Sequence, residues 1–256
     1  MDLLSAIILG IVEGISEFLP ISSTGHLILA SHLLRLQQTE FLKSFEIAIQ
    51  LGAILSVAVL YWRQLVLERK VLTRVAVAFM PTAVIGFVLY KVIKNVLFDS
   101  NAVIVWALLL GGIFLIIFEL FYRERESSVE DMASISYTQA LMIGIFQSIA
   151  VIPGVSRAAA TIVGGLILGL KRRTIVEFSF LLAVPTMGAA VALDLVKSAG
   201  AFTAGDFVFL AVGFIVSFIV ALLSIKFLLA FIKGHSFIPF GIYRIALALS
   251  FFIAGI

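Results

Sequence analysis

The chain has 256 residues, of which 62% are hydrophobic and 13% are charged, and its formal net charge at pH 7 is +3. Soluble domains average about 45–50% apolar and about 25% charged residues, so this composition excludes an ordinary soluble protein and indicates a surface that faces lipid. The lack of cysteine excludes disulfides and thiolate-bound metals, and the modest positive charge is typical of basic cytoplasmic loops, so we expect no nucleic-acid partner.

The first apolar region, residues 3–34, is interrupted by Pro20 near its middle. Each half is too short to cross a hydrocarbon core of about 30 Å. We therefore predict a re-entrant helical hairpin, which a membrane protein tolerates only where the irregular turn lines a polar cavity. Continuous apolar stretches then predict three transmembrane helices, over residues 45–62, 75–94 and 102–122.

A second broken region, residues 137–170, carries Pro153 and Gly154 in its middle and predicts a second re-entrant hairpin. Three more apolar stretches predict transmembrane helices over 176–196, 206–232 and 236–256. The sequence thus predicts an all-α polytopic membrane protein with six transmembrane helices and two re-entrant hairpins, forming a single membrane domain over residues 1–256.

The two broken regions resemble each other: residues 10–24 read GIVEGISEFLPISST and residues 144–157 read GIFQSIAVIPGVSR. Each has a glycine followed three residues later by Glu or Gln, and then a Pro-x-x-Ser sequence. We predict an internal repeat of a hairpin plus three spans, over residues 1–130 and 131–256. Because three spans is an odd number, the second copy must enter the membrane with inverted topology.

The distribution of basic residues favours one orientation of this repeat. Ten Lys and Arg residues fall on one side, in the predicted loops 63–74, 123–136, 171–173 and 233–235, against five on the other side. The side richer in basic residues is normally cytoplasmic, which predicts that both termini lie outside. Inverted repeats with broken helices form their site near the midplane where the copies meet, so we expect the two hairpin turns to face each other.

Glu13 and Glu17 are four residues apart in the first hairpin and would share one face of a helix. Two carboxylates on one face repel each other unless a cation or a proton lies between them. Ionisable residues inside a bilayer are costly and usually functional. We therefore predict that Glu13 and Glu17 bind a hard divalent cation.

Hydroxyl groups and a histidine follow at the first turn, where residues 20–26 read PISSTGH. Ser22, Ser23 and Thr24 could simply cap a helix, but beside two carboxylates they are candidate ligands of a phosphate. His26 could abstract a proton or attack phosphorus.

The second turn reads PGVSRAAAT over residues 153–161. Gly154 permits a tight turn, and the helix that follows would direct free N–H groups at an anion. Arg157 is a rigid donor fork that suits phosphate oxygens. Together the two turns supply what phosphoryl transfer needs, namely a cation, positive donors and a nucleophile.

These motifs, from Glu13-x-x-x-Glu17 to the Arg157-x-x-x-Thr161 sequence, resemble the undecaprenyl-diphosphate phosphatase family, of the bacitracin-resistance type. Residues 177–186 (EFSFLLAVPT) and 236–244 (SFIPFGIYR) are also similar to that family, and the resemblance covers essentially the whole chain.

The resemblance implies hydrolysis of undecaprenyl diphosphate to the monophosphate carrier lipid of cell-wall synthesis. It further implies a divalent cation (Mg²⁺ or Ca²⁺), a bacterial inner-membrane location and a site that opens to the outer side. In this family's pattern Glu13 and Glu17 serve the metal or acid–base chemistry, and Ser23 or His26 is nucleophile or base. Ser156, Arg157 and Thr161 hold phosphate.

One departure from the family pattern concerns the residues after Arg157, which are commonly Ser and Gly but here are Ala158 and Ala159. The missing hydroxyl puts one phosphate contact in question. Gln50 is a further candidate neighbour of the site. Arg244 lies inside the last apolar stretch, where we expect it to pair with a carboxylate, Asp194 or Glu119.

The residues leave several alternatives open. A lipid-phosphate transporter or flippase would use the same arginine and carboxylates, since carriers often have inverted repeats with re-entrant hairpins. The nucleophile could be Ser23, His26 or a metal-bound water. The sequence also does not decide the identity of the cation, the side on which the cavity opens, or whether the chain forms a homodimer.

Overall fold

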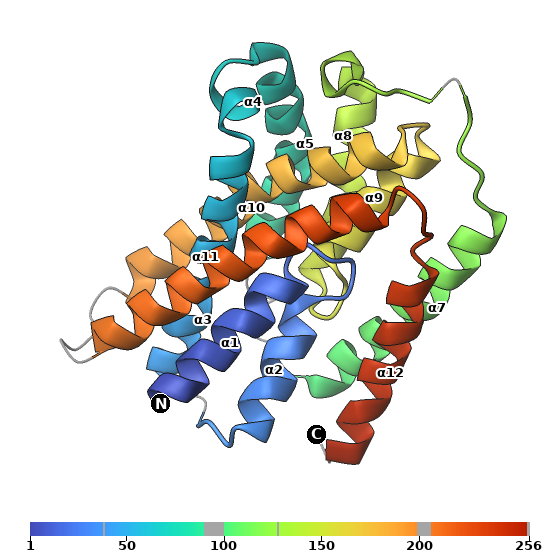
Figure 1. The fold of residues 1–256 in the computed structure, drawn as a ribbon. Coiled ribbons are helices and arrows are strands. Elements are labelled where there is room, and N and C mark those ends of the chain that lie inside the picture. Colours follow the sequence, from blue (N-terminus) through green and yellow to red (C-terminus); the bar gives the residue numbers. More distant parts are fainter. Residues whose placement is uncertain (38, 90–99, 127, 199–205, 255–256) are drawn as a thin grey trace.

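The computed structural model describes residues 1–37, 39–89, 100–126, 128–198 and 206–254. Within these ranges all regular secondary structure is helical, apart from one isolated β-bridge between Val129 and Leu170. The labels are those of Figure 1. The first half contains α1 (Leu3–Ser16), α2 (Ser23–Leu33), α3 (Glu40–Leu60), α4 (Trp62–Val66), α5 (Arg69–Val88) and α7 (Asn101–Phe121). The second half contains η2 (Met132–Ser134), α8 (Tyr137–Ser148), η3 (Ile149–Val151), α9 (Arg157–Ile167), α10 (Arg172–Ser198), α11 (Asp206–Phe231) and α12 (Ile238–Ala254).

The helices have the apolar outer surface that a bilayer requires. Among the described residues, five helices are long and apolar enough to cross a membrane: α3, α5, α7, α10 and α11. Large apolar side chains such as Phe87, Phe121 and Ile253 point outward and are more than four-fifths exposed. A water-soluble protein rarely exposes so much apolar surface, and the chain is therefore a polytopic membrane protein.

Four shorter helices form two hairpins. In the first, α1 packs against α2, and in the second α8 packs against α9, as the pairs lie side by side in Figure 1. They have 14, 11, 12 and 11 residues, which at 1.5 Å per residue makes each roughly 16–21 Å long. None matches a hydrocarbon core of about 30 Å.

Helix boundaries differ from the predicted ones most clearly at residues 63–74. The predicted loop 63–74 is largely helical, since α4 and the first turn of α5 occupy it. Charged residues such as Arg69 and Lys70 stop a membrane span but not a helix, because a solvated helical turn accommodates them. The last predicted span, 236–256, corresponds to α12, which has 17 described residues and is shorter than the five long helices.

Glycines set the closest approaches between hairpin helices and long helices. The α1 helix packs on α11, and a Cβ atom added to Gly10 would lie 2.8 Å from the carbonyl oxygen of Gly213. Correspondingly, α8 packs on α5, where a Cβ atom on Gly144 would overlap the carbonyl oxygen of Ala78. Without side chains at these points, the short helices can lie against the spans backbone to backbone, as small residues allow in membranes.

We predict that Gly144→Ala lowers the melting temperature of the detergent-solubilised protein by roughly 5 °C, because overpacking forces α8 away from α5. Gly86→Ala is the matched control, since nothing lies within 4 Å of a Cβ atom added there and alanine favours the helix. Equal melting temperatures for the two variants would contradict this close contact.

Candidate functional site

The two hairpin turns both contain a residue with left-handed backbone geometry. In the first turn Ser22 has φ +72°, and in the second Gly154 has φ +90°. Glycine adopts this conformation freely, and at Gly154 a Cβ atom would also come within 2.7 Å of the carbonyl oxygen of Ile104. Ser22 pays a conformational cost there, and such residues often mark functional sites. Each turn leads directly into a short helix, α2 or α9.

A polar cavity of about 150 Å³ lies between these turns. Both short helices begin at its wall, so their N-terminal N–H groups and positive dipole ends are near the cavity. It therefore has the features of an anion site at paired helix N-termini. It is lined by Glu17, Ser22, Ser23, Thr24, Gln50, Ala150, Val155, Ser156, Arg157 and Met187.

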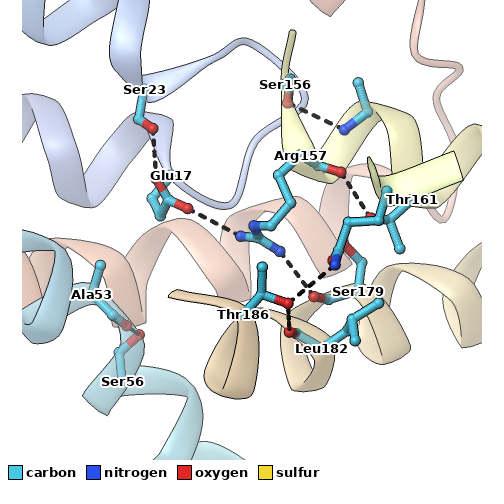
Figure 2. A network of polar contacts seen from close by, with 12 residues as sticks. Glu17, Ser23, Ala53, Ser56, Ser156, Arg157, Thr161, Ser179, Leu182 and Thr186 are labelled. Atoms are coloured by element: carbon cyan, nitrogen blue, oxygen red, sulfur yellow. Dashed lines mark hydrogen bonds and ion pairs between the residues drawn. The ribbon is translucent and has the colours of Figure 1, made fainter. Parts of the chain in front are cut away.

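Arg157 links the two hairpins across this cavity (Figure 2). Its Nη2 donates to Glu17 Oε1 at 3.1 Å, and its Nη1 donates to the carbonyl oxygen of Ser179 on α10 at 3.0 Å. Its buried Nε has no hydrogen-bond partner within the described ranges. Two of the five N–H groups of the guanidinium thus hold it in place, and the Nε–H group is among those that remain for a ligand.

Ser23 completes a short chain of polar groups. Its Oγ donates to Glu17 Oε2 at 2.5 Å, so Glu17 accepts from Ser23 with one oxygen and from Arg157 with the other. A hydroxyl that donates to a carboxylate and lines a cavity can serve as a nucleophile whose proton passes to that carboxylate.

Ser156 and Thr161 support the start of α9. The Oγ of Ser156 accepts from the backbone N–H of Ala159 at 3.1 Å and caps the helix. Thr161 donates to the carbonyl oxygen of Arg157 at 2.8 Å and is fully buried outside the cavity. Its contacts are those of a residue that fixes the first turn of α9.

Glu13 is fully buried one helical turn before Glu17, and neither of its carboxylate oxygens has a hydrogen-bond partner among the residues that the structure describes. A buried carboxylate in this position requires a cation or a proton. The residues therefore fit a divalent cation held by Glu13 and Glu17. Among the described residues no group of three or more His, Cys, Asp or Glu side chains could hold a metal, so further ligands would be hydroxyl, backbone, water or phosphate oxygens.

His26 lies outside the polar cavity, and both of its ring nitrogens are engaged. Its Nδ1 is 2.7 Å from the carbonyl oxygen of Ser22, to which it donates, and its Nε2 is 2.8 Å from the hydroxyl of Tyr243. The two rings also stack, with centroids 5.4 Å apart. This geometry holds the first turn against α12, and it supports Ser23 rather than His26 as the attacking group.

Arg244 is buried between the two turns, with 1% of its surface exposed. The expectation of a carboxylate partner at Glu119 is wrong, because Glu119 pairs with Arg172. The side chain of Asp194 lies outside the described residues. The guanidinium of Arg244 instead donates to four backbone carbonyls: Pro20 and Gly154 in the two turns, and Ala107 and Leu108 in α7.

The two residues that depart from the family pattern do not line the polar cavity. Ala158 is buried in the apolar core, and Ala159 lies on a neighbouring apolar groove. Hydroxyl loss at these positions therefore removes no group from the cavity of this chain.

Several partners of the site were not predicted from the sequence. The carbonyl of Ser179 and the side chain of Met187 come from α10, and Tyr243 comes from α12. A backbone carbonyl leaves no signal in a sequence. Tyr243 could have been noticed because it directly precedes the intramembrane Arg244.

The fold and the site together define a helical membrane protein with a small, partly buried cavity suited to a phosphate-type anion. The chain belongs to the family described as bacitracin resistance protein BacA, which it matches over residues 6–250. It is 52% identical over 253 residues to an undecaprenyl-diphosphatase of Sulfurihydrogenibium sp. (strain YO3AOP1), with 99% of each chain covered. It is also 54% identical over 244 residues to an undecaprenyl-diphosphatase of Aquifex aeolicus (strain VF5), with 95% of each chain covered.

We predict that Arg244→Leu lowers the melting temperature by more than about 10 °C, because four buried carbonyls lose a charged donor and each such bond is worth about 1.5–3 kcal/mol. Arg125→Leu, in an exposed loop, is the control and should leave the melting temperature unchanged. If both variants melt at the wild-type temperature, Arg244 does not hold the turns together.

Proposed function

We propose that this protein hydrolyses undecaprenyl diphosphate to undecaprenyl phosphate and inorganic phosphate, and so regenerates the lipid carrier of cell-wall synthesis. The relatives named undecaprenyl-diphosphatase match it over nearly their whole length at about half identity. The observation that carries the proposal is the placement of Arg157, Glu17 and Ser23 around one polar cavity. These groups are the phosphate donor, the acid–base group and the hydroxyl that the reaction needs.

In the proposed reaction the terminal phosphate enters the polar cavity and binds the guanidinium of Arg157 and the N-termini of α2 and α9. Arg157 then interacts with both the phosphate and Glu17. Its interaction with Glu17 becomes weaker, so the carboxylate becomes a stronger base. Ser23 Oγ attacks the terminal phosphorus while Glu17 takes its proton. The bond from phosphorus to the bridging oxygen breaks, and undecaprenyl phosphate leaves.

Glu17 first gives its proton to the departing undecaprenyl phosphate. Water then attacks the serine phosphate ester and passes a proton to Glu17, which returns it to the Ser23 oxygen as the bond from phosphorus to that oxygen breaks. The second step releases inorganic phosphate and restores the Ser23 hydroxyl. The contacts of His26 with Ser22 and Tyr243 support an orienting role for the imidazole in this scheme.

We also propose a divalent cation, Mg²⁺ or Ca²⁺, held by Glu13 and Glu17. Support comes from the two unpartnered oxygens of the buried Glu13, because hard cations prefer carboxylate oxygens. When bound, such an ion offsets negative charge on the phosphate oxygens.

The proposed topology has six transmembrane helices and two re-entrant hairpins in the bacterial inner membrane, with the cavity open to the outer side. Helices too short to cross the membrane support the hairpins. The inverted repeat is supported by the way helices pair. In this repeat α1 corresponds to α8, and α5 corresponds to α11. The α1 helix packs on α11, and in the same way α8 packs on α5.

We predict that Arg157→Ala and Ser23→Ala each lower kcat for phosphate release from farnesyl or undecaprenyl diphosphate by roughly 10²–10³-fold. The assay uses detergent-purified protein without a membrane gradient. Arg173→Ala, an exposed arginine paired with Glu177, and Ser250→Ala, in α12, are the matched controls and should retain full activity.

A phosphoenzyme trapped on Ser23 would support the serine route, whereas one trapped on His26 would overturn it. Single-step inversion at phosphorus with no trapped intermediate would favour an activated water. Intact substrate after incubation of wild-type protein with Mg²⁺ or Ca²⁺ would refute the phosphatase itself. Movement of intact lipid phosphate across vesicles would then favour a transporter.

We predict that chelation abolishes phosphate release and that Mg²⁺ or Ca²⁺ restores it. Glu13→Gln should raise the cation concentration for half-maximal activity by roughly tenfold or more, because it removes a charged ligand. The exposed Glu68 provides the control Glu68→Gln, with an unchanged requirement. Activity that survives exhaustive chelation would rule the cation out.

A further inference from the structure

An apolar groove of about 670 Å³ lies next to the polar cavity and is formed by α7, the end of α8, and α9. Its volume is within the range of about 300–1,000 Å³ that is usual for ligand sites. It follows α7 from Ala102 to Leu115, a distance of roughly 20 Å along the helix. Aromatic side chains of Trp106, Phe114 and Phe146 contribute to its walls.

The groove and the polar cavity share one wall. Val155 lines both of them. The next residues of the chain then diverge: Ser156 and Arg157 face the polar cavity, whereas Ala159 and Ala160 line the groove. The first turn of α9 thus has a phosphate-binding side and an apolar side.

Charge at the groove also points to an anionic lipid. Among the described residues that line it, Arg244 alone is charged. Its hydrogen bonds go to neutral carbonyls, including those of Gly154 at 3.1 Å and Ala107 at 2.9 Å. Among the described residues Arg244 has no carboxylate partner. Such a cation on the wall of an apolar groove complements a ligand with an anionic head and an apolar chain.

We infer that this groove binds the first isoprene units of the lipid substrate while the diphosphate of the same molecule occupies the polar cavity. The inference rests on the proposed function, which supplies a ligand with a diphosphate joined directly to a long apolar chain. Val155 lies at the junction, where the chain passes from phosphate to hydrocarbon. Burial of isoprene units in the groove removes apolar surface from solvent or detergent and adds to binding.

A kinetic test compares substrates of different chain length. Ala160→Phe fills the groove, and we expect it to raise KM for farnesyl and undecaprenyl diphosphate by about tenfold, the loss expected when one or two methylene groups are no longer buried. Dimethylallyl diphosphate has one isoprene unit and occupies only the start of the groove, so its KM should rise much less than the KM of the two longer substrates. Trp106→Ala removes a wall residue that is 57% exposed, so this second variant should fold normally and show the same dependence on chain length.

Ala190→Phe is the matched control, because Ala190 is exposed on α10 and does not line the groove. It should leave KM for all three substrates unchanged. The inference is overturned if the groove variants affect all chain lengths equally, or if KM for undecaprenyl diphosphate does not change. Either result would mean that the groove holds ordinary membrane lipid or another copy of the chain.

A binding test separates this inference from the proposed function. The chain has two tryptophans, so Trp62→Phe leaves Trp106 as the sole tryptophan reporter. A farnesyl diphosphonate with bromine on its terminal isoprene unit should quench Trp106 in a saturable manner, and excess inorganic diphosphate should reverse the quenching. This outcome supports the groove even in a protein that shows no hydrolysis. Quenching that does not saturate, or that inorganic diphosphate does not reverse, refutes it.

Discussion

The ion pair between Glu17 and Arg157 is the contact on which the site depends. It joins residues 140 positions apart, one from each hairpin, and both side chains are largely buried. An isolated charge in such surroundings costs several kcal/mol, so each hairpin turn supplies the charge that stabilises the other. The polar cavity, the two helix N-termini and the position of the Ser23 hydroxyl all follow from this meeting of opposite charges.

The sequence was sufficient to predict which polar residues gather, because intramembrane charges are rare and each requires a reason. Glu17, Ser23, Gln50 and Arg157 do line one cavity. Their neighbours were harder to predict. The hydroxyl that engages His26 is 217 residues away, and no local spacing encodes that distance. The partners of Arg244 are backbone carbonyls, which every residue possesses, so a search for carboxylates could not find them.

Hydropathy located the long helices well, since apolar length is what a bilayer selects. It located helix ends poorly at 63–74, because a helix can continue into the interface after its apolar part ends. The inverted repeat stays a prediction. Its two hairpins differ chemically. The carboxylate of Glu13 has no hydrogen-bond partner in the described part of the chain, whereas the side chain of Gln147, at the matching position, donates to Thr82 and Thr186. The acidic chemistry is thus confined to one hairpin, and the arginine to the other.

The position of Arg244 in the last helix has a consequence for biosynthesis. A chain emerging from the ribosome inserts α1, α2 and α7 long before it contains residue 244. The carbonyls of Pro20, Ala107 and Gly154 therefore lack their shared donor, Arg244, until α12 has been synthesised. Because the same helix brings the hydroxyl of Tyr243 to His26, both turns acquire their final support in one late event. A chain truncated before α12 therefore carries every side chain that lines the polar cavity but lacks the groups that hold the two turns in register.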